Sequence, residues 1–244
     1  AFTQIGGRTR SRIAALRTTS DEDLAAGWNP EADGAVEALA VAENILYAGG
    51  QFSVIGGRKR SGLAALDLAS GIATTWNPSP GRPVSTIAAA EGDGTVYVGG
   101  DFSSIGVPLL RSRLAALDAE TGLPTAWDPN ADNTVRALAT DGNLIYVGGD
   151  FREIGGQARN RIAAVDLQGG ATDWDPDANG TVSTLAVAGD LLYVGGTFRT
   201  IGDFSHASVA AVDRTTAIPT TWNPQFNGSV NALAVAGNVV YAGG

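Results

Sequence analysis

The stretch YVGGDFSSIG from Tyr97 to Gly106, continued by RLAALD from Arg113 to Asp118 and by TAWDP from Thr125 to Pro129, is one copy of a unit that this sequence writes five times. Successive tryptophans lie 48, 51, 47 and 48 residues apart. A period of this length is typical of folds that repeat one supersecondary unit. Every copy has one Tyr-x-Gly-Gly step and one tryptophan before Asn-Pro or Asp-Pro, namely Tyr47, Tyr97, Tyr146, Tyr193 and Tyr241, and Trp28, Trp76, Trp127, Trp174 and Trp222.

Each copy is expected to contain four short strands. In one copy, VSTLAV (182–187) and LLYV (191–194) flank the turn residues Ala188, Gly189 and Asp190, which is a hairpin signature. A third apolar run is clearest at 113–117, and after the turn DAETG (118–122) a short fourth strand ends at Trp127. Four strands in about 48 residues leave no room for a helix. The sequence therefore predicts an all-β fold, a five-bladed β-propeller of four-stranded antiparallel blades.

The two ends of the sequence complement each other. The last residues, VVYAGG, stop where other copies continue into Phe-x-x-Ile-Gly, and the first residues, AFTQIGG, supply that continuation. We expect one domain over residues 1–244, a monomeric ring in which one blade takes its inner strands from 230–235 and 239–243 and its outer strands from 12–16 and 25–28. Such pairing would remove open sheet edges. The absence of methionine and the start at Ala1 also fit an excised or engineered piece.

Small residues mark the strand of each copy nearest the ring axis. In VEALAV (36–41), Val36, Ala38 and Ala40 are expected to face one neighbouring blade, and Leu39 and Val41 the other. The Gly-Gly pairs predict bulges or close backbone contacts. The positions that vary most between copies are expected to line the central channel, and these are Glu37, Ser85, Arg136, Ser183 and Asn231.

The strings YVGGDF, IGG, RLAALD, TG and WDP resemble propeller repeats of the delta-sixty type in secreted bacterial proteins, over the whole chain. They also resemble the tryptophan-docking motif of quinoprotein propellers, here Ala116, Asp118, Thr121, Gly122 and Trp127, although the tryptophan lies one residue further on. That resemblance implies a structural indole between adjacent blades. It also implies a quinoprotein oxidoreductase as the enzymatic alternative. Two features argue against that alternative: the chain has five units where quinoproteins usually have eight, and it lacks the vicinal cysteines of many members.

Two sets of polar residues are candidate ligand sites, because loops after the second and fourth strands of a blade emerge on the same face. Guanidinium groups beside amides and carboxylates are able to hold a carboxylate or a sugar. The alternative is that each arginine pairs with a carboxylate or loop carbonyl and joins the blades. The first set is Arg10, Arg60, Arg111, Arg159 and His206, often with a second arginine at Arg12, Arg113 and Arg161, and the second set is Asn29, Asn77, Asp128, Asp175 and Asn223.

The same loops carry alternating oxygen side chains that are typical of calcium ligands. The candidate calcium residues are Asp175, Asp177 and Asn179 in one copy and Asp128, Asn130 and Asp132 in another. The spacing departs from an EF-hand, because the twelfth position counted from Asp175 is Ala186. Asx turns with glycine at positive φ explain most of the pattern without a metal, so no cofactor is expected and calcium is the alternative.

Composition narrows the function. The chain has 16 basic and 25 acidic side chains, a net charge of −9, which argues against a nucleic-acid partner. It has no cysteine and one histidine, so cysteine or histidine zinc sites and thiol catalysis are excluded, and no Ser/His/Asp set stands out. No stretch approaches the length of about 18–20 apolar residues that a membrane-spanning helix needs.

The function expected from these patterns is that of a non-catalytic scaffold, extracellular or on the cell surface, whose loop face binds a protein or a glycan. A multivalent lectin, similar to tachylectin-type five-bladed propellers in blade number, is the second hypothesis. An engineered or excised ring without its own activity is the third, and the quinoprotein oxidoreductase is the fourth.

Overall fold

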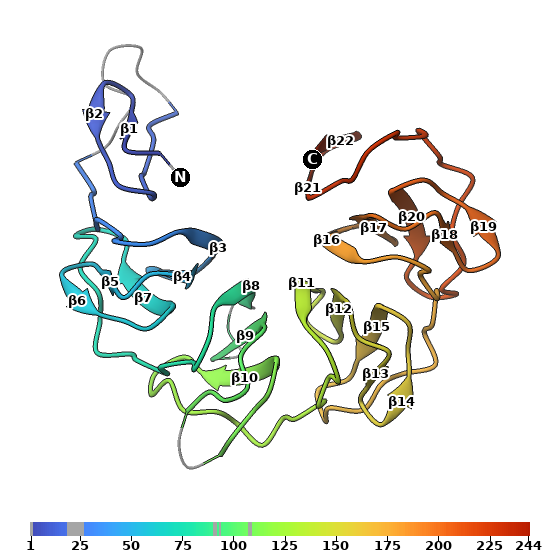
Figure 1. The fold of residues 1–244 in the computed structure, drawn as a ribbon, viewed down its shortest axis with the longest axis horizontal. Coiled ribbons are helices and arrows are strands. Elements are labelled where there is room, and N and C mark those ends of the chain that lie inside the picture. Colours follow the sequence, from blue (N-terminus) through green and yellow to red (C-terminus); the bar gives the residue numbers. More distant parts are fainter. Residues whose placement is uncertain (1, 19–26, 90–91, 93, 107–108) are drawn as a thin grey trace.

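The computed structural model describes residues 2–18, 27–89, 92, 94–106 and 109–244, and this part contains strands and no helix. Four three-stranded antiparallel sheets follow one another along an arc, which ends in a two-stranded sheet (Figure 1). The predicted all-β class is confirmed. Blade 1 contains β3 (Val36–Ala42), β4 (Ile45–Gly50) and β7 (Leu63–Asp67); blade 2 contains β8 (Val84–Ala89), β9 (Thr95–Gly100) and β10 (Leu114–Asp118); blade 3 contains β11 (Val135–Thr140), β12 (Ile145–Gly149) and β15 (Ile162–Val165); blade 4 contains β16 (Val182–Ala188), β17 (Leu191–Gly196) and β20 (Val209–Asp213); the terminal hairpin contains β21 (Ala232–Ala236) and β22 (Val239–Gly243).

Small two-stranded hairpins lie in the segments that follow the second strand of a copy, where only a loop was expected. Figure 1 places three of them on the outer side of the arc, beside blades 1, 3 and 4. Their second strands are exposed along their whole length. The pairs are β1 (Gln4–Ile5) with β2 (Arg8–Thr9), β5 (Val54–Ile55) with β6 (Arg58–Lys59), β13 (Glu153–Ile154) with β14 (Gln157–Ala158), and β18 (Thr200–Ile201) with β19 (Phe204–Ser205).

The short fourth strand predicted for each copy is not formed as a strand in blades 1 to 4. The fourth position is reduced to one isolated bridge to the third strand, at Ala73, Pro124, Ala171 and Pro219 in the four blades. The same single bridge forms at alanine and at proline, so the short pairing does not depend on the proline residues. The next amide continues the contact, since Thr125 N donates to Ala116 O at 2.8 Å, and the chain then turns into the tryptophan.

The Gly-Gly pairs produce the predicted bulges. In all four blades the register shifts at the start of the inner strand, between Val36 and Ala38 in blade 1. The bulge reverses the side-chain alternation, so the prediction that Val36 lies on the same face as Ala38 and Ala40 is wrong. Ala38 and Ala40 pack against blade 2 as expected, whereas Val36 packs on the opposite side.

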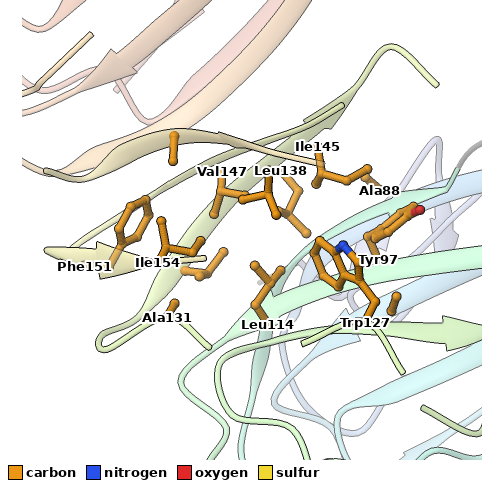
Figure 2. Packing of buried hydrophobic residues seen from close by; sticks show 14 residues of the cluster. Ala88, Tyr97, Leu114, Trp127, Ala131, Leu138, Ile145, Val147, Phe151 and Ile154 are labelled. Carbon is orange, nitrogen blue, oxygen red and sulfur yellow. The ribbon is translucent and has the colours of Figure 1, made fainter. Parts of the chain in front are cut away.

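The core lies between blades rather than within one sheet. Figure 2 shows Tyr97, Leu114 and Trp127 packed with Leu138 and Val147 across the boundary between blades 2 and 3. The ring of Trp127 meets Tyr97 edge-on at 5.2 Å, and its Nε1–H donates to the Asp166 carbonyl of blade 3 at 2.8 Å. The predicted burial of the indoles between blades is therefore confirmed for Trp28, Trp76, Trp127 and Trp174, which expose 3–9% of their surface.

The pairing predicted for the two ends is not present in this structure. Among the described residues β22 pairs only with β21, and no named strand covers 12–16. Part of the other predicted strand, 25–28, lies outside the described residues. Figure 1 shows the two ends on either side of an opening in the arc. The reason is that the terminal hairpin packs on blade 4, whereas Ile13 and Trp28 pack on blade 1.

Candidate functional site

The arginines of the first candidate set bind main-chain carbonyls of their own copy; Arg10, Arg60 and Arg111 are buried, and Arg159 is half-buried. Arg111 donates through Nη1 to Leu110 O at 2.9 Å, through Nη2 to Thr125 O at 2.7 Å and through Nε to Trp127 O at 3.0 Å. Arg159 donates in the same way to Ala158 O at 2.8 Å and Thr172 O at 2.6 Å. Arg60 contacts the carbonyls of Lys59 and Thr74, and Arg10 donates to Thr9 O at 2.8 Å. The contacts with Thr74, Thr125 and Thr172 tie the segment after the second strand to the residues before the tryptophan.

The second arginines make a complementary link. Arg12, Arg113 and Arg161 have φ values of 67°, 63° and 64°. Their Nη1 groups donate to the carbonyls of Ala32, Ala131 and Ala178, at 2.9, 3.5 and 3.0 Å. Each of these alanines lies in the loop that follows the tryptophan, so the two arginine sets bind the chain on either side of the tryptophan.

Members of the two candidate sets come together in two copies. Arg111 Nη1 lies 3.7 Å from Asp128 Oδ2, and Arg159 Nη1 lies 3.5 Å from Asp175 Oδ2. In the other copies the amide turns elsewhere, since Asn29 Nδ2 donates to Glu31 Oε1 and Asn223 Nδ2 donates to Ser205 O, both at 2.9 Å. Asn77 Oδ1 accepts from Ser79 Oγ at 3.2 Å. The guanidinium N–H groups of these arginines thus donate to loop carbonyls and hold the loops in place.

The acidic loops use their oxygens to bind backbone amides. Asp132 Oδ1 accepts from Arg152 N and Glu153 N at 2.8 and 3.2 Å, and Asn179 Oδ1 accepts from Arg199 N and Thr200 N at 2.8 and 3.0 Å. Within the part of the chain that the structure describes, no three His, Cys, Asp or Glu side chains gather as metal ligands. Burial raises the pKa of Asp175, the nearby Asp177 carboxylate adds to this, and Arg159 opposes it.

The glycines of these loops do not have positive φ, which corrects the expected turn, and Gly34 and Gly180 instead allow a close approach of two backbone segments. The left-handed residue is the second after the Asn or Asp, and it is Glu31, Ser79, Asn130, Asp177 or Gln225, with φ between 49° and 54°. A Cβ on Gly180 would come within 2.6 Å of Phe198 Cα. Glycine is required there because the loop lies directly on the backbone of the next segment.

The residues of the resembled docking motif build a turn. Asp118 Oδ1 accepts from Thr121 Oγ1 and Thr121 N, each at 2.7 Å, and these hydrogen bonds lower the pKa of the carboxyl. A Cβ on Gly122 would lie 3.2 Å from the Trp76 ring. The Asp118 carbonyl thus accepts a hydrogen bond from the Trp76 indole of the preceding copy, and Gly122 lets the turn pack closely against that ring.

The positions that vary between copies line one cavity of about 390 Å³, as predicted for the central channel. Two of them already bind neighbours of their own copy. Arg136 Nε lies 2.7 Å from Asp150 Oδ2, and Gln51 Nε2 donates to Glu37 Oε1 at 2.5 Å. Ser85, Ser183 and Asn231 complete the set. The opposite charges of Arg136 and Glu37 give the channel no single sign.

A polar cluster between blades 3 and 4 was missed from the sequence. Arg214 contacts the Asp141 carboxylate and donates to the Tyr146 hydroxyl at 3.1 Å. Burial acts to raise the pKa of Asp141, but the amides of Leu144 and Asn143 and the Arg214 guanidinium outweigh it, so the pKa is lowered. The signal available in the sequence is that Arg214 stands where other copies have Leu68, Ala119 and Leu167.

His206 replaces the arginine of the first set in one copy. It exposes 3% of its surface, and its Nδ1 has no hydrogen-bond partner among the described residues. Burial lowers the pKa of His206, because the charged imidazolium would lose water without gaining an acceptor.

Acidification is expected to destabilise the protein through His206. The unfolded chain takes up the proton near pH 6.5 and the folded chain only at lower pH, so stability is complete above pH 6.5 and falls as the pH drops toward the folded pKa. The limit for one proton is about 1.4 kcal/mol per pH unit. Urea unfolding between pH 7.5 and 5 measures this slope.

The matched variants are His206→Gln and His206→Arg. The glutamine variant removes the titrating group, so the slope between pH 7 and 5.5 is expected to disappear. The arginine variant restores the donor of the other copies and is expected to raise stability by about 1–2 kcal/mol at pH 7. An unchanged slope in H206Q would show that another group titrates.

Comparison with known proteins supports the architecture. No protein-family model and no curated protein matches the chain. Solved structures do, at 14–18% identity: the computationally designed Ika8 protein (TM-score 0.56, 18% identity, 86% of this chain and 55% of that chain), the Pan2 WD40 domain of Neurospora crassa (0.58, 14%, 86% and 56%) and a chain of the mitotic checkpoint complex (0.60, 15%, 93% and 61%). The chain thus spans little more than half the length of these structures. The likeness shows a β-propeller type of fold, and no helix of the described residues is fit to cross a membrane.

Proposed function

We propose that the chain is a non-catalytic β-propeller scaffold of five blades, secreted or on the cell surface, whose loop face binds a protein or a glycan. The observation that carries the proposal is that the repeated polar residues hold loops in place, while the small hairpins between them present different exposed residues. In a binding scaffold we expect repeated residues to maintain the fold and the exposed residues to differ from copy to copy.

The exposed hairpin strands differ in chemistry from copy to copy. They offer two basic residues in β6, Arg58 and Lys59, an amide in β14, Gln157, and an aromatic ring in β19, where 48% of Phe204 is exposed. An exposed aromatic beside polar groups suits protein or sugar recognition. We place the binding surface at these strands instead of at the buried arginines.

A glycan array, probed with the labelled chain with and without calcium, tests the choice between the two ligand classes. The matched variant carries Lys59→Ser, Gln157→Ser and Phe204→Ser, and an unchanged Tm would show that it is folded. Glycan binding that the variant loses would establish the lectin alternative at this surface. Glycan binding that the variant keeps would move the site elsewhere, and no glycan binding leaves a protein partner. Dye reduction with pyrroloquinoline quinone and calcium would overturn the non-catalytic proposal.

A further inference from the structure

A cavity of about 270 Å³ lies between blades 1 and 2, beside the turns that join the first strand of each blade to the second. None of the described residues that line it is basic, and they include Ala42, Glu43, Tyr47, Ala119 and Glu120. Pockets for drug-sized ligands measure roughly 300–1,000 Å³, so this smaller cavity suits a group of the size of one side chain.

Ala119 leaves this space open. The same position, directly after the third strand, holds leucine in blades 1 and 3 and Arg214 in blade 4. Arg214 reaches the preceding blade, where it donates through Nε to the Tyr146 hydroxyl at 3.1 Å and contacts the Asp141 carboxylate. Its central guanidinium carbon lies 5.6 Å from the centre of the Tyr146 ring. Between blades 3 and 4 the fold therefore accepts a guanidinium group at this position.

The carboxylates at the boundary of blades 1 and 2 are shifted by one residue. When the copies are aligned on the repeated tyrosines, Ala42 occupies the position of Asp141, and the carboxylate follows at Glu43. On the other side of the cavity, Glu120 follows Ala119. Within the described part of the chain neither carboxylate forms an ion pair, so both are available to a cation from outside.

Tyr47 contributes a buried hydroxyl to the same cavity. Only 3% of Tyr47 is exposed, and among the described residues its hydroxyl has no hydrogen-bond partner. Trp76 packs edge-on against the Tyr47 ring, with 5.3 Å between the ring centres. Burial raises the pKa of Tyr47, and the nearby Glu43 carboxylate adds to this. A donor that reaches this hydroxyl would satisfy a polar group that burial has removed from water.

We propose that this cavity binds the guanidinium group of a ligand, in the place that Arg214 takes between blades 3 and 4. The guanidinium N–H groups would donate to the Glu43 carboxylate and the Tyr47 hydroxyl, and the Tyr47 ring would contact the cation. A planar guanidinium suits such a site better than an ammonium, because it both donates in a fork and stacks on a ring. The site is separate from the surface of the proposed function, since the small hairpins follow the opposite end of the second strands.

Calorimetric titration of the full chain with two guanidinium probes tests the site. The probes are agmatine and the acetylated and amidated peptide Gly-Gly-Arg-Gly-Gly. At least one is expected to bind, and its analogue with a neutral urea in place of the guanidinium is expected to bind at least about tenfold more weakly. Binding of agmatine alone would assign the site to a small free guanidine, whereas binding of the peptide would assign it to an arginine side chain of a protein.

Matched variants locate the binding. Glu43→Gln is expected to weaken probe binding by about tenfold, whereas Glu153→Gln, at an exposed residue of β13, is expected to leave it unchanged. Ala119→Leu introduces the side chain of blades 1 and 3 and is expected to abolish binding by filling the cavity. Ala119→Arg supplies the guanidinium from within the chain, so its Tm is expected to exceed that of A119L by about 2–4 °C.

Any of four results would overturn the inference. Neither probe binds, binding persists in A119L, the urea analogues bind as tightly as the guanidinium probes, or A119R is no more stable than A119L. The titrations and the Tm values use no glycan, so a failure here is distinguishable from a failure of the proposed function.

Discussion

Replacing Trp127 with alanine is expected to lower the free energy of unfolding by about 3–5 kcal/mol. The indole is 6% exposed, packs edge-on against Tyr97, and donates to the Asp166 carbonyl of the next blade. The substitution therefore opens a cavity in the core between blades 2 and 3 and leaves a carbonyl without its donor (Figure 2). Urea unfolding followed by circular dichroism measures the loss.

Trp127→Phe separates the two contributions. Phenylalanine keeps most of the ring volume but removes the N–H, so the variant is expected to lose roughly half as much as W127A. In a repeat fold whose blades contact only their neighbours, a weakened boundary also lowers the cooperativity of unfolding. A loss of less than about 1 kcal/mol in W127A would contradict the role of the indole as the main link between these blades.

Replacing Gly149 with alanine is the second substitution with a large expected effect, a loss of about 3 kcal/mol. A Cβ at this position would overlap the carbonyl oxygen of Thr134 and lie 3.1 Å from Val135 Cα. Both are backbone atoms at the bulge of β11, so no side-chain rotation relieves the contact. Thermal and urea unfolding report the change.

Gly228→Ala is the matched control. Its Cβ would have nothing within 4 Å, and its φ lies outside the left-handed region, so the expected change is within about 0.5 kcal/mol. Equal losses in G149A and G228A would show that the effect comes from the flexibility of the unfolded chain and not from the bulge.

Much of the fold follows from short-range patterns in the sequence. The strands of the hairpin at 182–196 were predicted within two residues at each end, because alternation and turn residues are local signals. The fourth strand was overpredicted, since a short run before tryptophan does not reveal that the chain makes one bridge to the third strand and then turns away. The small outer hairpins escaped notice because strands of two residues have no measurable period.

In two copies the structure brings members of the two polar sets together, Arg111 with Asp128 and Arg159 with Asp175. The sequence predicted only that the loops of the two sets emerge on the same face. It left open whether the guanidinium groups serve a ligand or the fold, because that depends on which carbonyls lie within reach. The carbonyl of Thr125 lies within reach of Arg111, 14 residues before it, and the carbonyl of Thr172 lies within reach of Arg159, 13 residues before it.

The sequence by itself determined that this protein repeats one β unit five times, that its tryptophans are structural and that its glycine pairs make bulges. Each of these is written in residues a few positions apart, where sterics and alternation suffice. Only the tertiary structure decided that the bulge turns Val36 away from its alanine neighbours, that the arginines face main-chain carbonyls, and that the arc stands open between the two ends of the chain. These depend on which distant surfaces meet, and a local pattern specifies the surface of a strand but not the partner that covers it.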